Sequence, residues 1–312
     1  TTFNHIVAKI AQAKTTYAPD KRTKLLELSQ ADIAKNEYYI QSSEKIAIDY
    51  LKDELKNVNS TINYTLLPDA SVEDKPYAVV NLSVANMRTK PGHAAEMATQ
   101  ALLGTSVDIL QKEKGEYRVR TPEGYISYVP SSSVTAFNKS DFDNWKNSSK
   151  VIYTTEFGKS YSSPDKKSIR VSDLVYGNIL ALTKETKAFY EVKYPDGRIA
   201  YIPKDEAISM DKWIDSRALT ADNVLASAET MLGLPYLWGG TSVKGVDCSG
   251  FTKTAYYMNG YIIPRDASQQ VLAGDKIEIL DANGNFDATV ALKNLKPADL
   301  LFFAGGKANN PN

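Results

Sequence analysis

The sequence predicts a multidomain α+β protein: a small N-terminal α/β unit, two small β barrels and a C-terminal α+β domain. The chain has 312 residues, enough for two or three domains of about 100–200 residues each. Its middle contains an ungapped repeat of short strand-like segments, and its last third combines helical periodicity with paired glycines. The predicted units are residues 1–75, 76–137, 146–210 and 218–312.

Composition excludes several classes of protein. Lys plus Arg and Asp plus Glu each number 37, so the basic excess typical of nucleic-acid-binding proteins is absent. The sequence contains no apolar run of about 18 residues, so it predicts no transmembrane segment. One cysteine cannot form an internal disulfide or a Cys-based zinc site, and two histidines, His5 and His93, leave little room for a His-rich metal centre. We therefore expect no metal and no cofactor.

Residues 1–75 predict an α/β unit without a chemical motif, so we expect a packing or spacer role. Apolar residues at helical spacing predict a helix over 3–13. Short strands are expected at 26–28 and 38–40, and an alternating strand at 62–66. Ser43 is a candidate helix cap. The helix after it would bury one face made of Ile46, Tyr50, Leu51 and Leu55.

The internal repeat predicts two β barrels. Residues 117–130 align without gaps on residues 190–203, at an offset of 73 that also pairs Gly104 with Gly177. In each copy a strand runs into Pro-Glu-Gly or Pro-Asp-Gly, a tight-turn signal, and a second short strand ends at proline. Two copies of about 65 residues are too few for a solenoid.

One difference between the copies points to a ligand. Glu96 in the first copy stands opposite Ile169 in the second. A carboxylate in one copy alone indicates that this copy faces a charged group. The alternative is an ordinary solvated surface glutamate.

The C-terminal third carries the chemistry. A helix is expected to begin at Thr220 and to end at Gly233. Aromatic residues and paired glycines over 234–241 then indicate close backbone packing near a groove. Cys248 precedes a helical segment, 252–258, and so belongs to the first turn of a helix.

Cys248 is a candidate nucleophile. Unpaired N–H groups and the positive end of the helix dipole stabilise a thiolate, which is the nucleophilic form. Small Ser249 and Gly250 leave room for a substrate carbonyl, and the N–H of Cys248 can help to bind an oxyanion. Asp247 opposes a thiolate, so we assign it to the substrate or the loop. The alternative is a buried structural cysteine.

Two resemblances bear on these residues. The repeats resemble bacterial SH3-like (SH3b) domains, with Tyr128 and Tyr201 in place of the usual Trp. Residues 235–251 resemble the NlpC/P60 family of papain-like cysteine peptidases, whose pattern continues over the segments 264–270 and 295–303. Together with Tyr-Ala-Pro-Asp-Lys-Arg at 17–22, the order of domains resembles the multidomain γ-D-glutamyl-L-diamino-acid endopeptidases, also called dipeptidyl-peptidase VI.

The resemblance implies a role for each matching residue. Cys248 would be the nucleophile, and Asp266 and Glu96 would meet the free amine of a peptide. Ser268 stands near Asp266, although the family usually has serine directly after the aspartate, where this chain has Ala267. A tyrosine of the first barrel would close the pocket; our choice is Tyr128, with Tyr117 as the alternative. The expected lining of the substrate cleft consists of Tyr236, Asp247 and Ser249.

The implied activity is that of a cysteine endopeptidase. It would hydrolyse the γ-D-Glu–diamino acid bond of murein stem peptides that carry a free N-terminal L-Ala, without a metal. The alternative is a non-catalytic peptidoglycan-binding SH3b protein with a degenerate hydrolase domain. We expect a monomer that acts in the cell envelope or outside the cell, with a cytoplasmic role in murein-peptide recycling as the alternative.

The general base is the main departure from the family. The family places a histidine on a strand after Asp-Leu-Leu-Phe-Phe, but no histidine follows Cys248 in this chain. His93 would break the family's chain order, so we do not choose it. We therefore expect the base beyond Asn312, in a part of the catalytic domain that this chain lacks.

Overall fold

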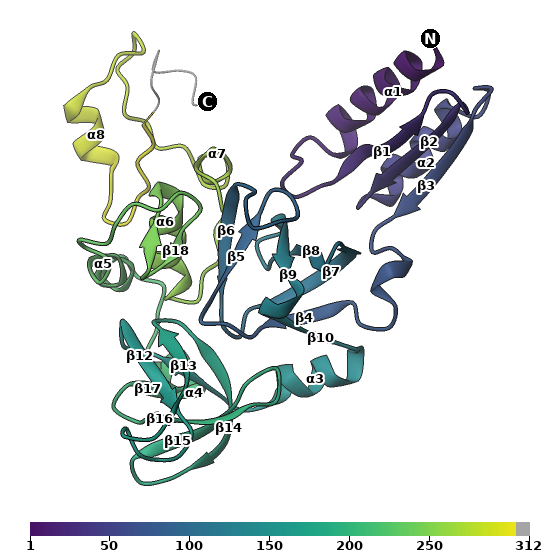
Figure 1. Cartoon of the computed structure of the whole chain (residues 1–312). Coiled ribbons are helices and arrows are strands. Elements are labelled where there is room, and N and C mark those ends of the chain that lie inside the picture. Colours follow the sequence, from purple (N-terminus) through teal and green to yellow (C-terminus); the bar gives the residue numbers. More distant parts are fainter. Residues whose placement is uncertain (304–312) are drawn as a thin grey trace.

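The structure is a computed structural model that describes residues 1–303, and it has a mixed α+β fold with several β sheets (Figure 1). The predicted α+β class is confirmed. Figure 1 shows the N-terminal unit and the C-terminal domain on opposite sides of a first β sheet, with a second β sheet below it. Over this range, no helix combines the length and the apolar character needed to cross a membrane.

The N-terminal unit is a three-stranded sheet with two helices packed against it. Its elements are α1 (Thr2–Tyr17), β1 (Leu26–Asp32), β2 (Glu37–Ser42), α2 (Lys45–Glu54) and β3 (Thr61–Leu66). The central strand β2 is antiparallel to β1 and parallel to β3. A parallel pair needs a crossover, which α2 supplies. Apolar side chains from both helices and the sheet form the core, among them Ile6, Ile10, Tyr38, Ile40 and Leu51.

The start of α2 differs from the prediction. Glu44, not Ser43, occupies the N-cap position. Ser43 Oγ instead accepts the N–H of Leu25 at 2.8 Å, at the start of β1. Ile46 is 59% exposed, because the buried face of the helix is formed by Ala47, Ile48 and Leu51.

Two β sheets follow, each with seven strands. The first contains β4 (Tyr77–Val80), β5 (Val84–Arg88), β6 (Met97–Leu102), β7 (Ser106–Glu113), β8 (Glu116–Arg120), β9 (Ile126–Pro130) and β10 (Val134–Phe137). The second contains β11 (Lys150–Tyr153), β12 (Phe157–Tyr161), β13 (Arg170–Val175), β14 (Ile179–Glu185), β15 (Phe189–Lys193), β16 (Ile199–Pro203) and β17 (Ala207–Ser209). The helix α3 (Lys139–Asn147) connects them.

The two sheets are structural copies of one another. The strand order is β10-β4-β7-β8-β9-β5-β6 in the first and β17-β11-β14-β15-β16-β12-β13 in the second. Every strand of the second sheet begins 73 residues after its counterpart. Gly104 and Gly177 both have φ of +88°, a conformation that favours glycine. The repeat found in the sequence is therefore a duplicated fold.

Neither sheet closes into the predicted barrel. Among residues 1–303, no ladder joins β10 to β6 or β17 to β13. The edge at β6 receives the C-terminal domain instead. Thr241 donates from its N–H to Gln100 Oε1 and from its Oγ1 to the Gln100 carbonyl oxygen, both at 3.0 Å. The last strand of the first sheet, β6, thus contacts the C-terminal domain.

The C-terminal domain follows the short helix α4 (Met210–Asp215). Thr220 caps its first helix, as predicted, by accepting the N–H of Asn223 at 3.3 Å. A two-stranded hairpin and a helix that begins at Cys248 come next. The elements of this domain are α5 (Ala221–Glu229), β18 (Thr241–Ser242), β19 (Gly245–Val246), α6 (Cys248–Tyr257), α7 (Ala267–Gln270) and α8 (Ala288–Asn294).

Both sheets hold the β18–β19 hairpin through equivalent positions. Gln100 on β6 and Asp173 on β13 are related by the 73-residue offset. Gln100 binds Thr241, as described above. Asp173 Oδ2 accepts hydrogen bonds from Lys244 Nζ at 2.7 Å and from Ser83 Oγ at 2.6 Å. The duplication thus supplies two anchors for the domain that carries Cys248.

Candidate active site

The thiol of Cys248 is exposed at the first position of α6. Asp247 caps this helix by accepting the N–H of Gly250 at Oδ1, 2.7 Å away. Residue 250 must be small, because a Cβ there would collide with the carbonyl oxygen of Gly240. A small residue at 250 therefore lets the first turn of α6 pack against Gly240, with Cys248 exposed at its start.

A buried arginine holds Asp247. Arg265, 1% exposed, donates from Nη1 to Asp247 Oδ1 at 3.1 Å and from Nη2 to Oδ2 at 2.7 Å. The N–H of Gly239 also reaches Oδ2, at 2.9 Å. Burial opposes ionisation, but Arg265 and the N–H groups of Gly250 and Gly239 outweigh it and hold the pKa of Asp247 below its usual value. The carboxylate therefore stays charged and locks the loop before Cys248.

Ser249 belongs to the same buried network. Its Oγ accepts a hydrogen bond from Arg265 Nη1 at 3.0 Å, and Arg265 Nε reaches Thr99 Oγ1 on β6 at 2.9 Å. Asp247 and Ser249 are both less than a tenth exposed. They support Cys248 from the protein interior, so their predicted contact with substrate stays a prediction.

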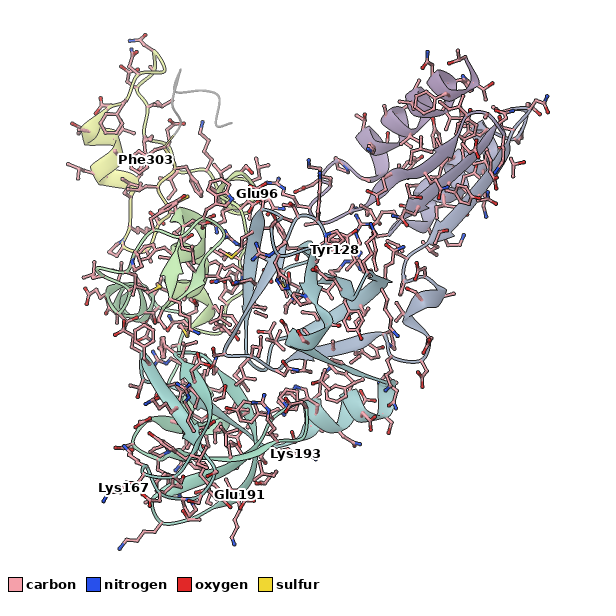
Figure 2. All side chains as sticks on the ribbon, viewed as in Figure 1. Glu96, Tyr128, Lys167, Glu191, Lys193 and Phe303 are labelled. Atoms are coloured by element: carbon pink, nitrogen blue, oxygen red, sulfur yellow. The ribbon has the colours of Figure 1, made fainter. Side chains whose placement is uncertain are left out.

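Two exposed aromatic side chains precede the hairpin. Burial and the neighbouring Cys248 and Asp247 raise the pKa of Tyr236, which is 66% exposed. Trp238, 62% exposed, donates from Nε1 to Oε1 of Glu96 at 3.0 Å. Figure 2 shows Glu96 at the end of the first sheet that faces the C-terminal domain. The structure thus brings Glu96 to the segment that carries Tyr236, and its role in substrate binding stays a prediction.

Asp266 lies where the N-terminal unit, the first sheet and the C-terminal domain meet. Its Oδ2 accepts hydrogen bonds from Arg22 Nη1 at 2.9 Å and from Tyr125 Oη at 3.4 Å. Ser268 Oγ accepts from the same Arg22 nitrogen at 2.7 Å. Asp266 directly follows Arg265, so this cluster adjoins the network below Cys248. Asp266 and Ser268 are therefore brought together despite the intervening Ala267.

Tyr128 does not take part in this cluster. Its ring lies 5.1 Å from the guanidinium carbon of Arg118, and its Oη donates to Glu113 at 3.3 Å. Burial and the nearby Glu113 and Glu27 raise the pKa of Tyr128 to about 12, although Arg118 opposes the shift. Figure 2 shows Tyr128 on the first sheet. Its side chain stabilises the junction with the N-terminal unit, where Arg118 pairs with Glu27 at 2.8 Å.

The role of Tyr128 as the pocket tyrosine stays a prediction, although its side chain contacts Arg118 and Glu113. The alternative, Tyr117, packs against the core of the first sheet. Tyr125 is the tyrosine of this sheet that contacts the C-terminal domain, through Asp266. It lies in the turn between β8 and β9, three residues before Tyr128.

Comparison with known proteins agrees with this arrangement. Residues 233–311 match the family model described as NlpC/P60 family, and residues 87–134 match that described as bacterial dipeptidyl-peptidase Sh3 domain. The C-terminal domain is an NlpC/P60 domain. The first sheet and its duplicate are SH3-like domains.

Two relatives and one solved structure extend the similarity beyond the NlpC/P60 domain. A Bacillus cereus protein named gamma-D-glutamyl-L-lysine dipeptidyl-peptidase is 33% identical over 222 residues, covering 68% of this chain and 61% of that protein. A Lysinibacillus sphaericus protein named dipeptidyl-peptidase 6 is 27% identical over 241 residues, covering 73% of this chain and 82% of that protein. A crystal structure of an NlpC/P60 family protein from Bacillus cereus has a TM-score of 0.62 at 26% identity, covering 75% of this chain and 85% of that one.

The histidine expected in the NlpC/P60 domain lies outside the described residues, because it was placed beyond Asn312. His93 is exposed in the loop before β6. Within residues 1–303, no hydrogen bond joins it to Cys248. The structure therefore gives no support to His93 as the base.

Sequence reasoning missed several residues around the NlpC/P60 site. Arg265 lies in the segment 264–270 that resembles the family, but nothing in that pattern showed that it pairs with Asp247. Tyr125 had a usable signal: its equivalent in the second SH3-like domain is Arg198, the same kind of difference that singled out Glu96. Arg22 lies in the Tyr-Ala-Pro-Asp-Lys-Arg stretch at 17–22, but nothing in that pattern showed that it binds Asp266, 244 residues away.

Proposed function

We propose that this protein is a cysteine peptidase that hydrolyses the γ-D-Glu–diamino acid bond of murein stem peptides with a free N-terminal L-Ala. The observation that carries the proposal is the exposed Cys248 at the N-terminus of α6, with Tyr236 beside it and Glu96 reaching the same segment from another domain. The name of the Bacillus cereus relative, gamma-D-glutamyl-L-lysine dipeptidyl-peptidase, supports this bond.

The proposed reaction passes through an acyl-enzyme. The Cys248 thiolate attacks the γ-carbonyl carbon of D-Glu, while N–H groups at the start of α6 stabilise the oxyanion. The C–N bond breaks, and the amine of the diamino acid leaves with a proton from the general base. Water then hydrolyses the thioester and releases L-Ala-γ-D-Glu. The histidine proposed for the proton transfers lies outside the described residues.

The proposed selectivity for a free amine rests on local carboxylates. Glu96 is exposed beside Trp238, and Asp266 is about a quarter exposed. Both belong to segments that adjoin the Cys248 loop. Opposite charges within about 4–6 Å stabilise an ammonium group, whereas an N-acetylated peptide gains nothing from them. The pocket would therefore admit the end of a trimmed stem peptide and disfavour a blocked one.

Peptide hydrolysis tests the proposal. The full-length protein, including the part proposed to carry the histidine, is incubated with L-Ala-γ-D-Glu-L-Lys, with its diaminopimelate equivalent and with the N-acetylated forms, and products are identified by mass spectrometry. Release of L-Ala-γ-D-Glu from the free-amine peptides, lost in Cys248→Ala, is expected. Binding without cleavage would overturn the proposed reaction and support a peptidoglycan-binding protein instead.

Two further expectations belong to this proposal. We place the protein in the cell envelope or outside the cell, and cell fractionation separates this from a cytoplasmic role in recycling. We also propose that it acts as a monomer. Light scattering of the purified protein measures the oligomeric state.

A further inference from the structure

The segment that leaves α1 contacts the NlpC/P60 domain directly. Figure 1 shows this segment reaching the end of the first sheet near α7. Asp20 Oδ2 accepts a hydrogen bond from Gln269 Nε2 at 2.7 Å, and Arg22 binds Asp266 and Ser268. The N-terminal unit was expected to be a spacer, but here it touches the residues assigned to the peptide's amine.

Arg22 uses both sides of its guanidinium group. Nε and Nη2 donate to the two oxygens of Asp20 at 2.7 and 3.0 Å. Nη1 donates to Asp266 Oδ2 at 2.9 Å and to Ser268 Oγ at 2.7 Å. Such a planar fork fixes the angle as well as the distance of its partners, which a lysine cannot do. Arg22 therefore orients Asp266 relative to the N-terminal segment.

The first SH3-like domain completes this arrangement. The N–H of Ile126 donates to the carbonyl oxygen of Arg22 at 2.6 Å and ties the segment to the sheet. Tyr125 Oη is a second donor to Asp266 Oδ2, at 3.4 Å. Burial, and then the charge of Asp266, raise the pKa of Tyr125 well above its usual value, so the phenol stays protonated and can donate.

Arg22 and Tyr125 both donate to Oδ2 of Asp266, so among residues 1–303 no side-chain donor reaches Oδ1. The same carboxylate caps α7 at the N–H of Gln269, and the Asp266 side chain remains 27% exposed. Asp20 and Asp266 together carry one more negative charge than Arg22 neutralises, so the cluster still attracts a cation. A carboxylate held at one oxygen is a pre-organised acceptor at the other, which lowers the entropy cost of binding an ammonium group.

We propose that Arg22 is a specificity-determining positioning residue: with Tyr125 it holds Oδ2 of Asp266, so that Oδ1 binds the free ammonium of the peptide. The N-terminal unit is then part of the substrate site and not a spacer. This inference rests on the proposed function, because the ammonium group belongs to the proposed substrate.

Peptide binding to the Cys248→Ala protein tests the proposal without turnover. Calorimetry compares L-Ala-γ-D-Glu-L-Lys with its N-acetylated form in that background, alone and combined with Arg22→Met, Arg22→Lys or Lys21→Met. Lys21 is exposed and forms no hydrogen bond or ion pair within residues 1–303, so Lys21→Met controls for the loss of one positive charge. Arg22→Met should weaken binding of the free-amine peptide by about tenfold, as expected when a charge-assisted contact is misaligned. Arg22→Lys should bind the free-amine peptide with intermediate affinity. Lys21→Met should leave that affinity unchanged, and no variant should change the affinity for the N-acetylated peptide.

The outcomes separate this proposal from the proposed function. If the protein with intact Arg22 binds both peptides equally, the proposed function fails and this inference fails with it. If it prefers the free amine and Arg22→Met keeps or increases that preference, only the inference is overturned, because Arg22 then serves structure or merely repels the ammonium. Circular dichroism verifies folding. Should Arg22→Met not fold, Tyr125→Phe, which removes only the second donor to Asp266, must reduce the preference.

Discussion

Arg265 donates two hydrogen bonds, of 3.1 and 2.7 Å, to Asp247. Asp247 directly precedes the helix α6 that presents Cys248. Arg265 also reaches Thr99 on the first SH3-like domain, so one buried guanidinium links the nucleophile's loop to a neighbouring domain. A buried charge without its partner is costly. The geometry of the site and the stability of the protein therefore depend on the same pair.

Asp247→Ala should destabilise the protein strongly. The substitution leaves Arg265 buried and unpaired, which costs about 3–5 kcal/mol of unfolding free energy. Urea unfolding of wild type and variant measures the difference. The control is Asp196→Ala, which breaks an Asp–Arg pair of the same 2.7 Å length with Arg198 on the surface of the second SH3-like domain. That pair should be worth about 0–1 kcal/mol. Equal losses for the two variants would contradict a special role for the buried pair.

Stability should fall in acid partly through Asp247. Its folded pKa lies below its unfolded value, so it contributes stability that is complete above about pH 4 and is lost as pH falls through the folded pKa. Asp247→Asn removes this contribution. Unfolding free energies measured between pH 7 and pH 3 should therefore decline less steeply below pH 4 in the variant. If the unfolding free energies of wild type and variant fall in parallel with pH, other carboxylates cause the loss of stability in acid.

Cys248 should react quickly with iodoacetamide near neutral pH. It is the one cysteine of the chain, so mass spectrometry of the intact protein reports its modification without ambiguity. Unfolding in urea removes the helix N-terminus, so the folded protein should react faster than the unfolded chain by about tenfold. A folded rate equal to or below the unfolded rate would support a structural thiol.

Glu96→Gln should reduce the preference for a free amine. Glutamine keeps an oxygen that accepts the hydrogen bond of Trp238 Nε1, so the change removes charge and little else. We expect kcat/KM for free-amine peptides to fall about tenfold, with no change for N-acetylated ones. Glu156→Gln, at an exposed position before β12, is the charge-matched control and should change neither value. If Glu96→Gln and Glu156→Gln change kcat/KM for the free-amine peptides equally, the proposed role of Glu96 is wrong.

Gly239→Ala should disturb the packing of the NlpC/P60 domain against the first SH3-like domain. Residue 239 has φ of +79°, and a Cβ there would lie 2.8 Å from the carbonyl oxygen of Met97. Gly233 has a similar φ of +83° but nothing within 4 Å of its Cβ position, so Gly233→Ala isolates the backbone strain. Gly239→Ala should lower the unfolding free energy by about 1–3 kcal/mol more than the control. Indistinguishable denaturation curves would show that the contact is dispensable.

The parts of the fold encoded by local patterns were predictable. The 73-residue offset predicted where the strands of the second SH3-like domain begin, because the copies retained the same turns. The helix starts at Thr220 and Cys248 follow from capping side chains and small residues, whose hydrogen bonds span three or four positions. The contact between β6 and the C-terminal domain was not predictable, since 141 residues separate Gln100 from Thr241.

The site residues also differ in how far the sequence could predict their roles. Tyr128 is shared with the second copy as Tyr201, and each pairs across its sheet, with Arg118 and with Glu191 respectively. A residue kept in both copies serves the fold that both share. The residues that differ, Glu96 and Tyr125, contact the NlpC/P60 domain. Comparing the copies position by position would have favoured Tyr125.

By itself, the sequence determined the duplication and offered Cys248 as a nucleophile candidate at the start of a helix, because turns and capping act over a few residues. The resemblance of its motifs to known families implied the SH3-like and NlpC/P60 domains. The tertiary structure alone decided that Arg265 holds Asp247 and that Arg22 reaches Asp266. Both contacts join segments that the chain order leaves apart, and their strength comes from burial and angle. Those properties exist only after the N-terminal unit, the first SH3-like domain and the NlpC/P60 domain have packed together.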